Sequence, residues 1–244
     1  QTAKDLNSFI IYAGVRQYRP AVNFALFAYF TKPNWINANK HFRYDFEEFT
    51  GTDDYTKQFV TTVMRTHTGQ CRSLPMYYKI LAEEIGAEAF LAQAPNHLYV
   101  KHLGEDNKWV NIELTNGNPA SDAHIISSMG ISAESIRNRV YLDSMNEKET
   151  MAFPLQELTH GYERLYGYDE FVMLCCDKSL EYYPHNMSAL LTKHNAARII
   201  GMEYNKTNGH RIDSTAKANH ERWRETAERI EELGFRDMPR EQYL

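Results

Sequence analysis

The chain has 244 residues, 43% hydrophobic and 24% charged, which is the balance of an ordinary soluble globular protein with one large domain or two small ones. Its net charge of −5 and scattered basic residues give no general attraction for nucleic acid, so no nucleic-acid partner is expected. The longest apolar run, Ala21 to Phe30, is too short to cross a bilayer, so no membrane span is expected either.

Three cysteines are too few for a disulfide framework. Cys175 and Cys176 are adjacent within a helical pattern and point in different directions, so we expect no bridge between them. The histidines form no His-x-x-x-His cluster, and neither a metal nor another cofactor is expected. Because the chain begins at Gln1 without methionine, it is compatible with a processed and exported product whose leader is missing.

The first fifty residues favour helices and a polar, aromatic connection. Apolar residues recur at helical spacing before a stop at Lys32-Pro33, namely Val22, Leu26, Tyr29 and Phe30. The connection then runs from Asn34 to Phe49. Thr52, Asp53 and Asp54 offer a cap for the next helix, whose apolar side we expect to contain Tyr55, Phe59, Val63 and Met64.

Pro75 fixes the start of a helix directly after Cys71. Proline lacks an N–H and would clash with the carbonyl group four residues earlier inside a helix, so Cys71 should lie at or just before the first turn. One side of this helix is apolar, made of Leu74, Tyr77, Tyr78, Leu81 and Ile85. Gly86 follows where a helix normally ends. Helix N-termini carry partial positive charge, which favours a thiolate at this position.

Two alternating segments predict a hairpin of antiparallel strands, His97 to Lys101 and Trp109 to Glu113. Packing the apolar residues together requires Leu98 to pair with Ile112, and this register sets His97 opposite Glu113. Asn111 would then face Tyr99. Gly104 to Asp106 suits a loop of three residues or slightly more. A carboxylate beside an imidazole selects its tautomer, which leaves the other ring nitrogen for a cysteine.

These residues resemble a known superfamily. Gly69-x-Cys71 before a helix, Pro95-Asn96-His97 before a strand and Trp109 to Thr115 are similar to the Cys, His and Asp boxes of transglutaminase-like domains. The resemblance covers roughly the middle fifth of the chain. It implies an α+β fold with a papain-like core and an antiparallel sheet, and acyl transfer or hydrolysis at amide bonds. Cys71 would be the nucleophile, His97 the general base and acid, and Glu113 the third member, where Asp is usual.

Each of these residues also has a plain structural interpretation. Free cysteine is often a small buried hydrophobe, so Cys71 could simply pack. His97 could cap a polar hairpin face, and Glu113 could be a surface carboxylate paired with Lys101. Trp109 and Tyr99 are interpreted as packing residues near the site.

After Gly117 the pattern changes. Asn118 to Ser135 is expected to be a polar connection, and Ile136 to Tyr141 the start of a helix. From Thr150 onward the pattern predicts two helical hairpins. The first two helices are expected to bury the stripes Leu155, Leu158, Tyr162, Leu165 and Phe171, Leu174, Ser179, Leu180.

The first helical pair resembles a tetratricopeptide-repeat unit. The likeness is carried by Gly161, Ser179 and the ending Leu180-x-x-x-Pro184-x-Asn186. Such repeats bind peptides or proteins through a concave face, which the resemblance implies here. The alternative is that these helices only brace the first domain. Because arrays of this kind need three or more units to bury a core, we expect the two pairs to dock on the Cys71 domain.

Two domains and two functions follow from these patterns. Residues 1–149 are expected to form the transglutaminase-like domain with its N-terminal helices, and residues 150–244 the docked helical region. The first function is a cysteine-dependent amide hydrolase or acyltransferase with a peptide or protein substrate. The alternative is a catalytically inactive module that binds a peptide or protein, favoured by Glu113 in place of Asp and by the bulky Arg72 beside Cys71.

Overall fold

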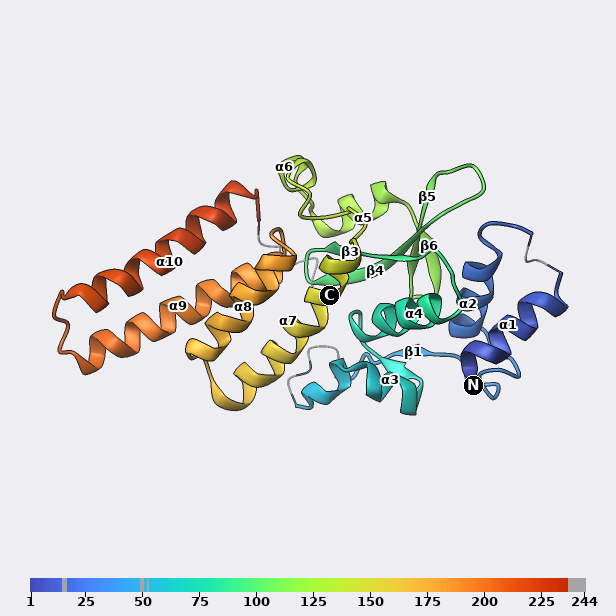
Figure 1. Cartoon of the computed structure of the whole chain (residues 1–244), viewed down its shortest axis with the longest axis horizontal. Helices are drawn as coiled ribbons and strands as arrows, with labels where there is room; N and C mark the ends of the chain where they lie inside the picture. The colour runs from blue at the N-terminus through green and yellow to red at the C-terminus, as the bar shows by residue number, and fades with distance from the viewer. Residues whose placement is uncertain (15–16, 49–50, 52, 237–244) are drawn as a thin grey trace. The chain divides into compact units, whose positions relative to one another are not determined.

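The computed structural model describes residues 1–14, 17–48, 51 and 53–236, and its fold is α+β (Figure 1). The chain divides into two compact units, Gln1–Gly130 and Ile131–Leu244. The boundary expected between residues 149 and 150 lies further along the chain than this division. Among the described helices, none combines the length and apolar character that a membrane crossing requires.

The first unit holds both sheets. A four-stranded antiparallel sheet has the order β3-β4-β5-β6, formed by β3 (Phe90–Ala94), β4 (His97–Leu103), β5 (Trp109–Glu113) and β6 (Asn118–Ala120). A short parallel pair consists of β1 (Arg43–Tyr44) and β2 (Thr68–Gly69). The helical elements are α1 (Thr2–Tyr12), α2 (Ala21–Thr31), η1 (Tyr55–Gln58), α3 (Val60–Thr66), α4 (Ser73–Glu84) and α5 (Asp122–Met129). The antiparallel sheet expected from the sequence is therefore present.

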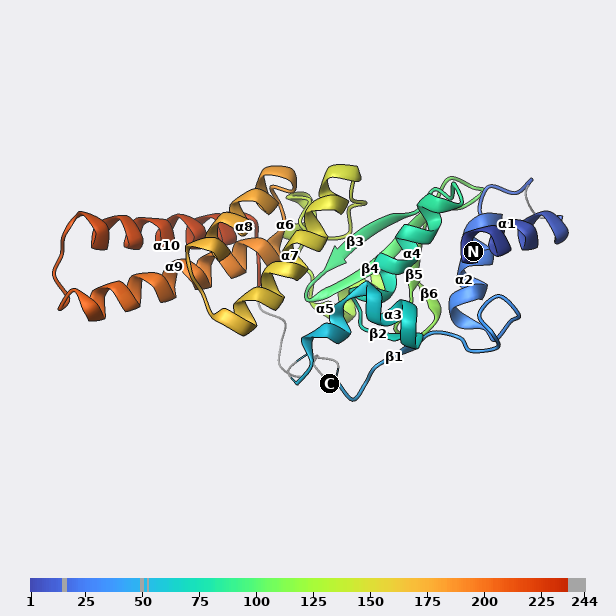
Figure 2. The ribbon, with the colours of Figure 1, turned by 60° about the horizontal axis from the view of Figure 1, so that its bottom comes forward.

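Helix α4 packs against strands β3 and β4 and supplies much of the core of the first unit (Figure 2). Its predicted apolar side is buried at Leu74, Tyr77, Tyr78 and Leu81, while Ile85 is half-buried. Gly86 has a φ of +70°, which confirms it as the residue that ends the helix. The Tyr78 hydroxyl is fully buried and donates to the Asn23 carbonyl at 2.9 Å, so it joins α4 to α2.

The register of the β4-β5 hairpin differs from the expected one. Val100 pairs with Ile112 and Lys101 with Asn111, so the predicted pairing of Leu98 with Ile112 is wrong by two residues. A shift of two residues leaves every side chain on the same face of the sheet. The alternation of apolar residues therefore predicted the faces correctly but could not select between the two registers.

The turn of this hairpin selects the observed register. Gly104 N–H donates to the Lys108 carbonyl at 2.9 Å, and Asn107 N–H donates to the Gly104 carbonyl at 3.2 Å. Asn107 adopts a φ of +57°, the left-handed conformation that closes a three-residue hairpin loop and that asparagine tolerates better than most residues. The predicted loop length is confirmed, and the loop is centred one residue later than expected.

Two other expectations on the first unit are corrected. The helix expected from Tyr55 onward is broken at Phe59 into η1 and α3, and Met64 is 54% exposed. Asp54 caps η1 by accepting from Thr56 N–H at 3.0 Å, whereas Thr52 lies outside the described residues. The expected polar connection after Gly117 in fact contains β6 and α5.

The second unit is helical. Its elements are α6 (Ala133–Arg137), α7 (Glu147–Tyr166), α8 (Glu170–Tyr182), α9 (Met187–Thr207) and α10 (Ser214–Glu232). The helix expected at Ile136 to Tyr141 is replaced by the earlier α6. The two expected hairpins correspond to α7 with α8 and α9 with α10.

The buried faces of α7 and α8 differ in part from those expected, although Ser179 is fully buried as predicted. Leu158, Leu165, Phe171 and Leu174, which belong to the predicted stripes, are at least half exposed. The core instead contains Val172, Met173 and Cys176 of α8 with Ala196 and Ala197 of α9. Both α7 and α8 carry apolar residues on two sides, and periodicity alone does not tell which side is buried.

Gly69, the last residue of β2, is tightly packed just before α4 begins, and a substitution there tests this packing. A Cβ atom there would overlap Val63 Cγ2 and lie 2.9 Å from Ser73 Oγ. Because an overpacked core typically loses about 1–3 kcal/mol, we expect Gly69→Ala to lower the free energy of unfolding by that amount in urea titrations.

Gly201 provides the control, since a Cβ atom there makes only an ordinary contact at 3.5 Å with Asn219. Gly201→Ala should be neutral or stabilising, because alanine is the better helix former. The double variant Val63→Ala/Gly69→Ala should lose less stability than the sum of the single variants, since the overlapping methyl group is gone. Strict additivity would contradict the packing explanation.

Candidate active site

Cys71 lies in the turn between β2 and α4, with its side chain half-buried. Helix α4 begins at Ser73, which confirms that Cys71 just precedes the first helical turn. The Ser73 hydroxyl accepts from Gln70 N–H at 2.9 Å and holds this turn against the start of the helix. In the first turn of α4, Leu74 N–H donates to the Gln70 carbonyl at 3.1 Å, Met76 N–H donates to the Arg72 carbonyl at 3.2 Å, and Pro75 has no N–H. These bonds leave the N–H of Ser73 available at the start of the helix, two residues after Cys71.

Gln70, the neighbour of Cys71, anchors the turn. Its side chain is fully buried, and its amide group donates to the Asp45 carbonyl at 3.2 Å and to the Glu48 carbonyl at 2.8 Å. Both amide hydrogens are thus used within the protein. Gln70 therefore fixes the position of Cys71 relative to the segment after β1 and is not a donor for a bound molecule.

His97 is brought to Cys71 by a tight turn between β3 and β4. Ala94 pairs with His97, so the loop contains only Pro95 and Asn96. Proline fixes a negative φ and Asn96 has a φ of +54°, which is the combination of a type II turn. The Cys71 thiol donates to the Asn96 carbonyl at 3.7 Å, so this turn and the Cys71 turn are in contact.

Glu113 contacts His97 at the other side of the imidazole. The distance from His97 Nε2 to Glu113 Oε2 is 2.6 Å, and the two side chains are only 11% and 10% exposed. The other carboxylate oxygen accepts from the Thr115 hydroxyl at 3.0 Å. The structure thus brings together all three residues predicted for the site, Cys71, His97 and Glu113.

The geometry of the His97–Glu113 contact differs from the expected one. In the observed register Glu113 comes level with Tyr99, one step beyond the Val100–Ile112 pair, and His97 is its diagonal neighbour. Diagonal neighbours on one face of a sheet are about 7–8 Å apart, which long side chains can span. The expectation of directly opposite residues is wrong, and the longer reach of glutamate compared with aspartate suits the diagonal arrangement.

The electrostatics of the site centre on His97. Burial alone would lower the pKa of the imidazole, but hydrogen bonds to the Cys71 thiol and the Glu113 carboxylate, together with their charges, raise it to about 10. Because Nε2 contacts Glu113, Nδ1 is the nitrogen left for the thiol. At neutral pH, His97 is therefore an imidazolium between two groups that can carry negative charge.

Tyr44 of β1 is a site residue that the sequence did not reveal. Its hydroxyl hydrogen-bonds the Cys71 thiol, and burial, followed by the nearby charges of Cys71 and Asp45, raises its pKa above the ordinary tyrosine value. The hydroxyl therefore stays protonated and can donate to sulfur. The signal in the sequence was the alternation of aromatic residues at Phe42, Tyr44 and Phe46, which is typical of a strand.

The remaining residues near the hairpin have structural roles. Lys101 lies over the Trp109 ring at 5.3 Å, and its ammonium group is 4.0 Å from the Asp122 carboxylate. Trp109 also packs edge-to-face on Phe90. The Tyr99 ring is fully buried and nearly parallel to the His97 ring at 6.5 Å, which confirms it as a packing residue.

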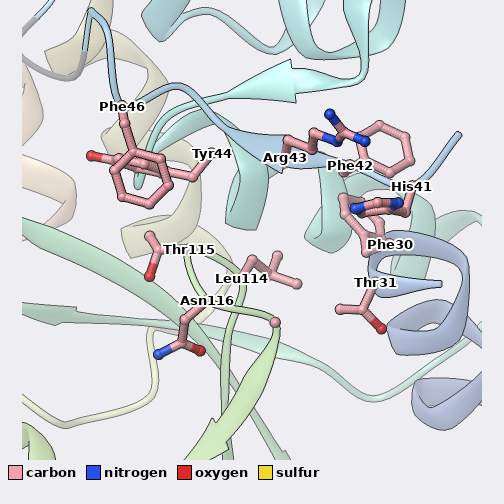
Figure 3. Close-up of a pocket in the computed structure, with 11 residues that line it drawn as sticks. Phe30, Thr31, His41, Phe42, Arg43, Tyr44, Phe46, Leu114, Thr115 and Asn116 are labelled. Atoms are coloured by element: carbon pink, nitrogen blue, oxygen red, sulfur yellow. The ribbon is translucent and has the colours of Figure 1, made fainter.

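A groove adjoins the site (Figure 3). It has a volume of about 380 Å³ and is bounded by the segment around β1 and the turn after β5. Its lining residues are Phe30, Thr31, His41, Phe42, Arg43, Tyr44, Phe46, Leu114, Thr115, Asn116 and Gly117. Tyr44 and Thr115 belong both to the groove and to the surroundings of the triad, because they contact Cys71 and Glu113.

Within the described part of the chain, no three His, Cys, Asp or Glu side chains are grouped so that they could hold a metal ion. No protein-family model, curated protein or solved structure matches this chain. The arrangement of Cys71, His97, Glu113 and Tyr44 is therefore the basis for an inference about function.

The buried pair predicts an unusual titration of His97. Its imidazole should titrate near pH 10 in NMR spectra of labelled histidine, above its ordinary value of 6.5. Because the folded-state pKa is raised, the stability that this proton contributes is complete below about pH 6.5 and is lost as the pH rises toward 10. In Glu113→Gln the carboxylate charge is gone, so the pKa of His97 should fall.

Glu105→Gln is the matched control, because Glu105 is an exposed carboxylate in the loop of the same hairpin. It should leave the titration of His97 unchanged. An imidazole of His97 that titrates near 6.5 in the unaltered protein would contradict the buried ion pair.

Proposed function

We propose that this protein is a cysteine-dependent hydrolase or acyltransferase that acts on an amide bond of a peptide or protein, built on a papain-like core of the transglutaminase type. The observation that carries the proposal is a single buried imidazole that contacts a thiol through one nitrogen and a carboxylate through the other. This combination of nucleophile, base and orienting acid supports covalent catalysis.

The Cys71 thiolate attacks the carbonyl carbon, a C–S bond forms, and the π electron pair moves to oxygen. The N–H of Ser73 at the start of α4 stabilises the resulting negative charge. When the C–N bond breaks, its electron pair goes to nitrogen, which takes the proton from His97 Nδ1. Water or an amine then attacks the thioester and gives a proton to Nδ1, while the C–S electron pair returns to sulfur.

Glu113 and Tyr44 have different tasks in this scheme. Glu113 keeps Nε2 occupied, stabilises the imidazolium and so directs Nδ1 to sulfur. Tyr44 donates its hydroxyl hydrogen to Cys71 and stabilises the thiolate before attack. The glutamate in place of aspartate favoured an inactive binding module in the sequence, but the 2.6 Å contact with His97 removes that reason.

The helical hairpins are proposed to be tetratricopeptide-repeat-like and to bind a polypeptide. Two contacts support the likeness at the α8–α9 connection. Asn186 is fully buried, donates to Ser179 Oγ at 3.1 Å and caps α9 by accepting from Ala189 N–H. The motif residues Ser179 and Asn186 thus fix the angle at which the two helices meet.

Reactivity of the thiols tests the proposal. Cys71 contacts the His97 imidazole and the Tyr44 hydroxyl, which are suited to assist a sulfur nucleophile, so iodoacetamide should modify it near neutral pH faster than Cys175 or Cys176. Cys176 should be inert, because burial raises the pKa of its thiol to about 12. Peptide mapping by mass spectrometry gives the three rates.

Acylation provides the second readout. With p-nitrophenyl acetate, the protein should release p-nitrophenol and carry an acetyl group on the peptide containing Cys71. His97→Ala should slow this step by about 10²–10⁴-fold, the usual contribution of a general acid or base. Cys175→Ala is the control and should react as the unaltered protein does. Acetyl transfer that persists in Cys71→Ala would refute the proposed nucleophile.

A further inference from the structure

The groove beside the triad has a free strand edge. In the parallel pair, Arg43 N–H donates to the His67 carbonyl at 2.9 Å and Asp45 N–H to the Gly69 carbonyl at 3.0 Å, so these amides point toward β2. Successive residues of a strand direct their main-chain groups to alternate sides. The main chain of Tyr44 therefore points away from β2.

This free edge faces the groove. Phe42 N–H, on the same side as Tyr44, donates at 2.8 Å to the carbonyl of Phe30, which lines the groove. In Figure 3, Phe30 and Leu114 lie across the groove from β1. Within the described part of the chain, no main-chain group is hydrogen-bonded to the outward side of Tyr44. An extended peptide could pair there as an additional strand.

The charge and the aromatic rings of the groove lining indicate which kind of peptide would bind there. Arg43 is exposed and is the single charged side chain that always carries its charge in the described lining, which contains no carboxylate. Aromatic rings line both ends of the groove, with Phe46 75% exposed and packed edge-to-face on Tyr44 at 4.8 Å. Positive charge and aromatic rings complement a strand that carries acidic and apolar side chains.

The groove lies next to the residues proposed to carry out the reaction. Tyr44 contacts Cys71 through its hydroxyl, and its main chain forms the free edge. Thr115 lines the opposite wall and donates to Glu113. A strand paired with Tyr44 would therefore lie beside the two residues that contact the Cys71 thiol and the Glu113 carboxylate.

We propose that an acidic polypeptide segment is the substrate, bound in extended form along the free edge of β1, with a carboxylate facing Arg43 and an amide carbonyl at Cys71. This inference rests on the proposed function for its chemistry. The binding step itself depends only on the groove, so the two can fail separately.

The test measures binding to the full-length Cys71→Ala protein, which cannot form the thioester. The probe is a short fluorescent peptide in which Glu and Phe alternate around one Gln, compared by anisotropy with the same peptide carrying Lys for Glu. The acidic peptide should bind more tightly and should shift the amide resonance of Tyr44 in NMR spectra. Equal binding of the lysine peptide, or an unchanged Tyr44 resonance, would overturn the inference.

Two further experiments test separately whether binding depends on the charge of Arg43 and whether it depends on strand pairing. Arg43→Glu should weaken the acidic peptide by about fivefold or more and favour the lysine peptide, whereas Arg65→Glu, an exposed arginine on α3 outside the groove, should leave the preference unchanged. Arg43→Gln should give an intermediate loss. A peptide N-methylated at alternate amides should lose binding, because it cannot pair with a strand edge. Binding of the methylated peptide, or of oligothymidylate, at the affinity of the parent peptide would exclude an added strand.

The acylation assay distinguishes the two proposals. If the acidic peptide binds as expected but Cys71 of the unaltered protein is never acetylated by p-nitrophenyl acetate, the groove assignment stands and the enzymatic function is wrong. If Cys71 is acetylated but the Arg43 variants do not change peptide preference, the enzymatic function stands and the substrate assignment is wrong.

Discussion

The contact on which the site depends is the buried pair of His97 and Glu113. A charge taken out of water is costly unless an opposite charge and hydrogen bonds compensate it, and this pair is about nine-tenths buried. Removal of either partner would leave the other uncompensated in the interior. The same contact occupies Nε2, so it fixes the ring orientation that turns Nδ1 to Cys71. Stability and reactivity are thus linked through one hydrogen bond, which is reinforced from outside by Thr115.

The choice of glutamate for this pair follows from the register of the hairpin. Asn107 adopts a left-handed conformation, which sets the loop and thereby the pairing of β4 with β5. In this register the acid is diagonal to His97 and must span a longer distance than a directly opposite residue would. One methylene group more than aspartate provides that reach. The departure from the motif therefore agrees with the local geometry of the hairpin.

Some features were predictable from the sequence for clear physical reasons. Pro75 restricts where a helix can begin, so it correctly predicted that Cys71 lies just before the N-terminus of α4. Strict alternation of apolar residues correctly predicted which side chains share a face of β4 and β5. The register was not predictable from alternation, since a shift of two residues preserves it. Tyr44 was missed because β1 pairs with a segment distant in the sequence, and the alternation of Phe42, Tyr44 and Phe46 does not reveal that partner. In α7 and α8 the sequence offered two apolar sides, and periodicity could not tell that the buried side would contain Gln156 in α7 and Val172 and Met173 in α8.

All the groups that the proposed chemistry needs come from residues 44 to 113 of the first unit, on a strand edge, two turns and a strand end. Each group is held by a different device: Cys71 by Gln70 and Ser73, His97 by the Pro95-Asn96 turn, and Tyr44 by the ladder with β2. Such a site keeps its geometry because no single loop carries it. The proposed chemistry uses no residue of the second unit. In the proposed scheme, selection of the substrate is left to the walls of the groove beside the triad, where the β1 edge offers the main chain of Tyr44 for pairing.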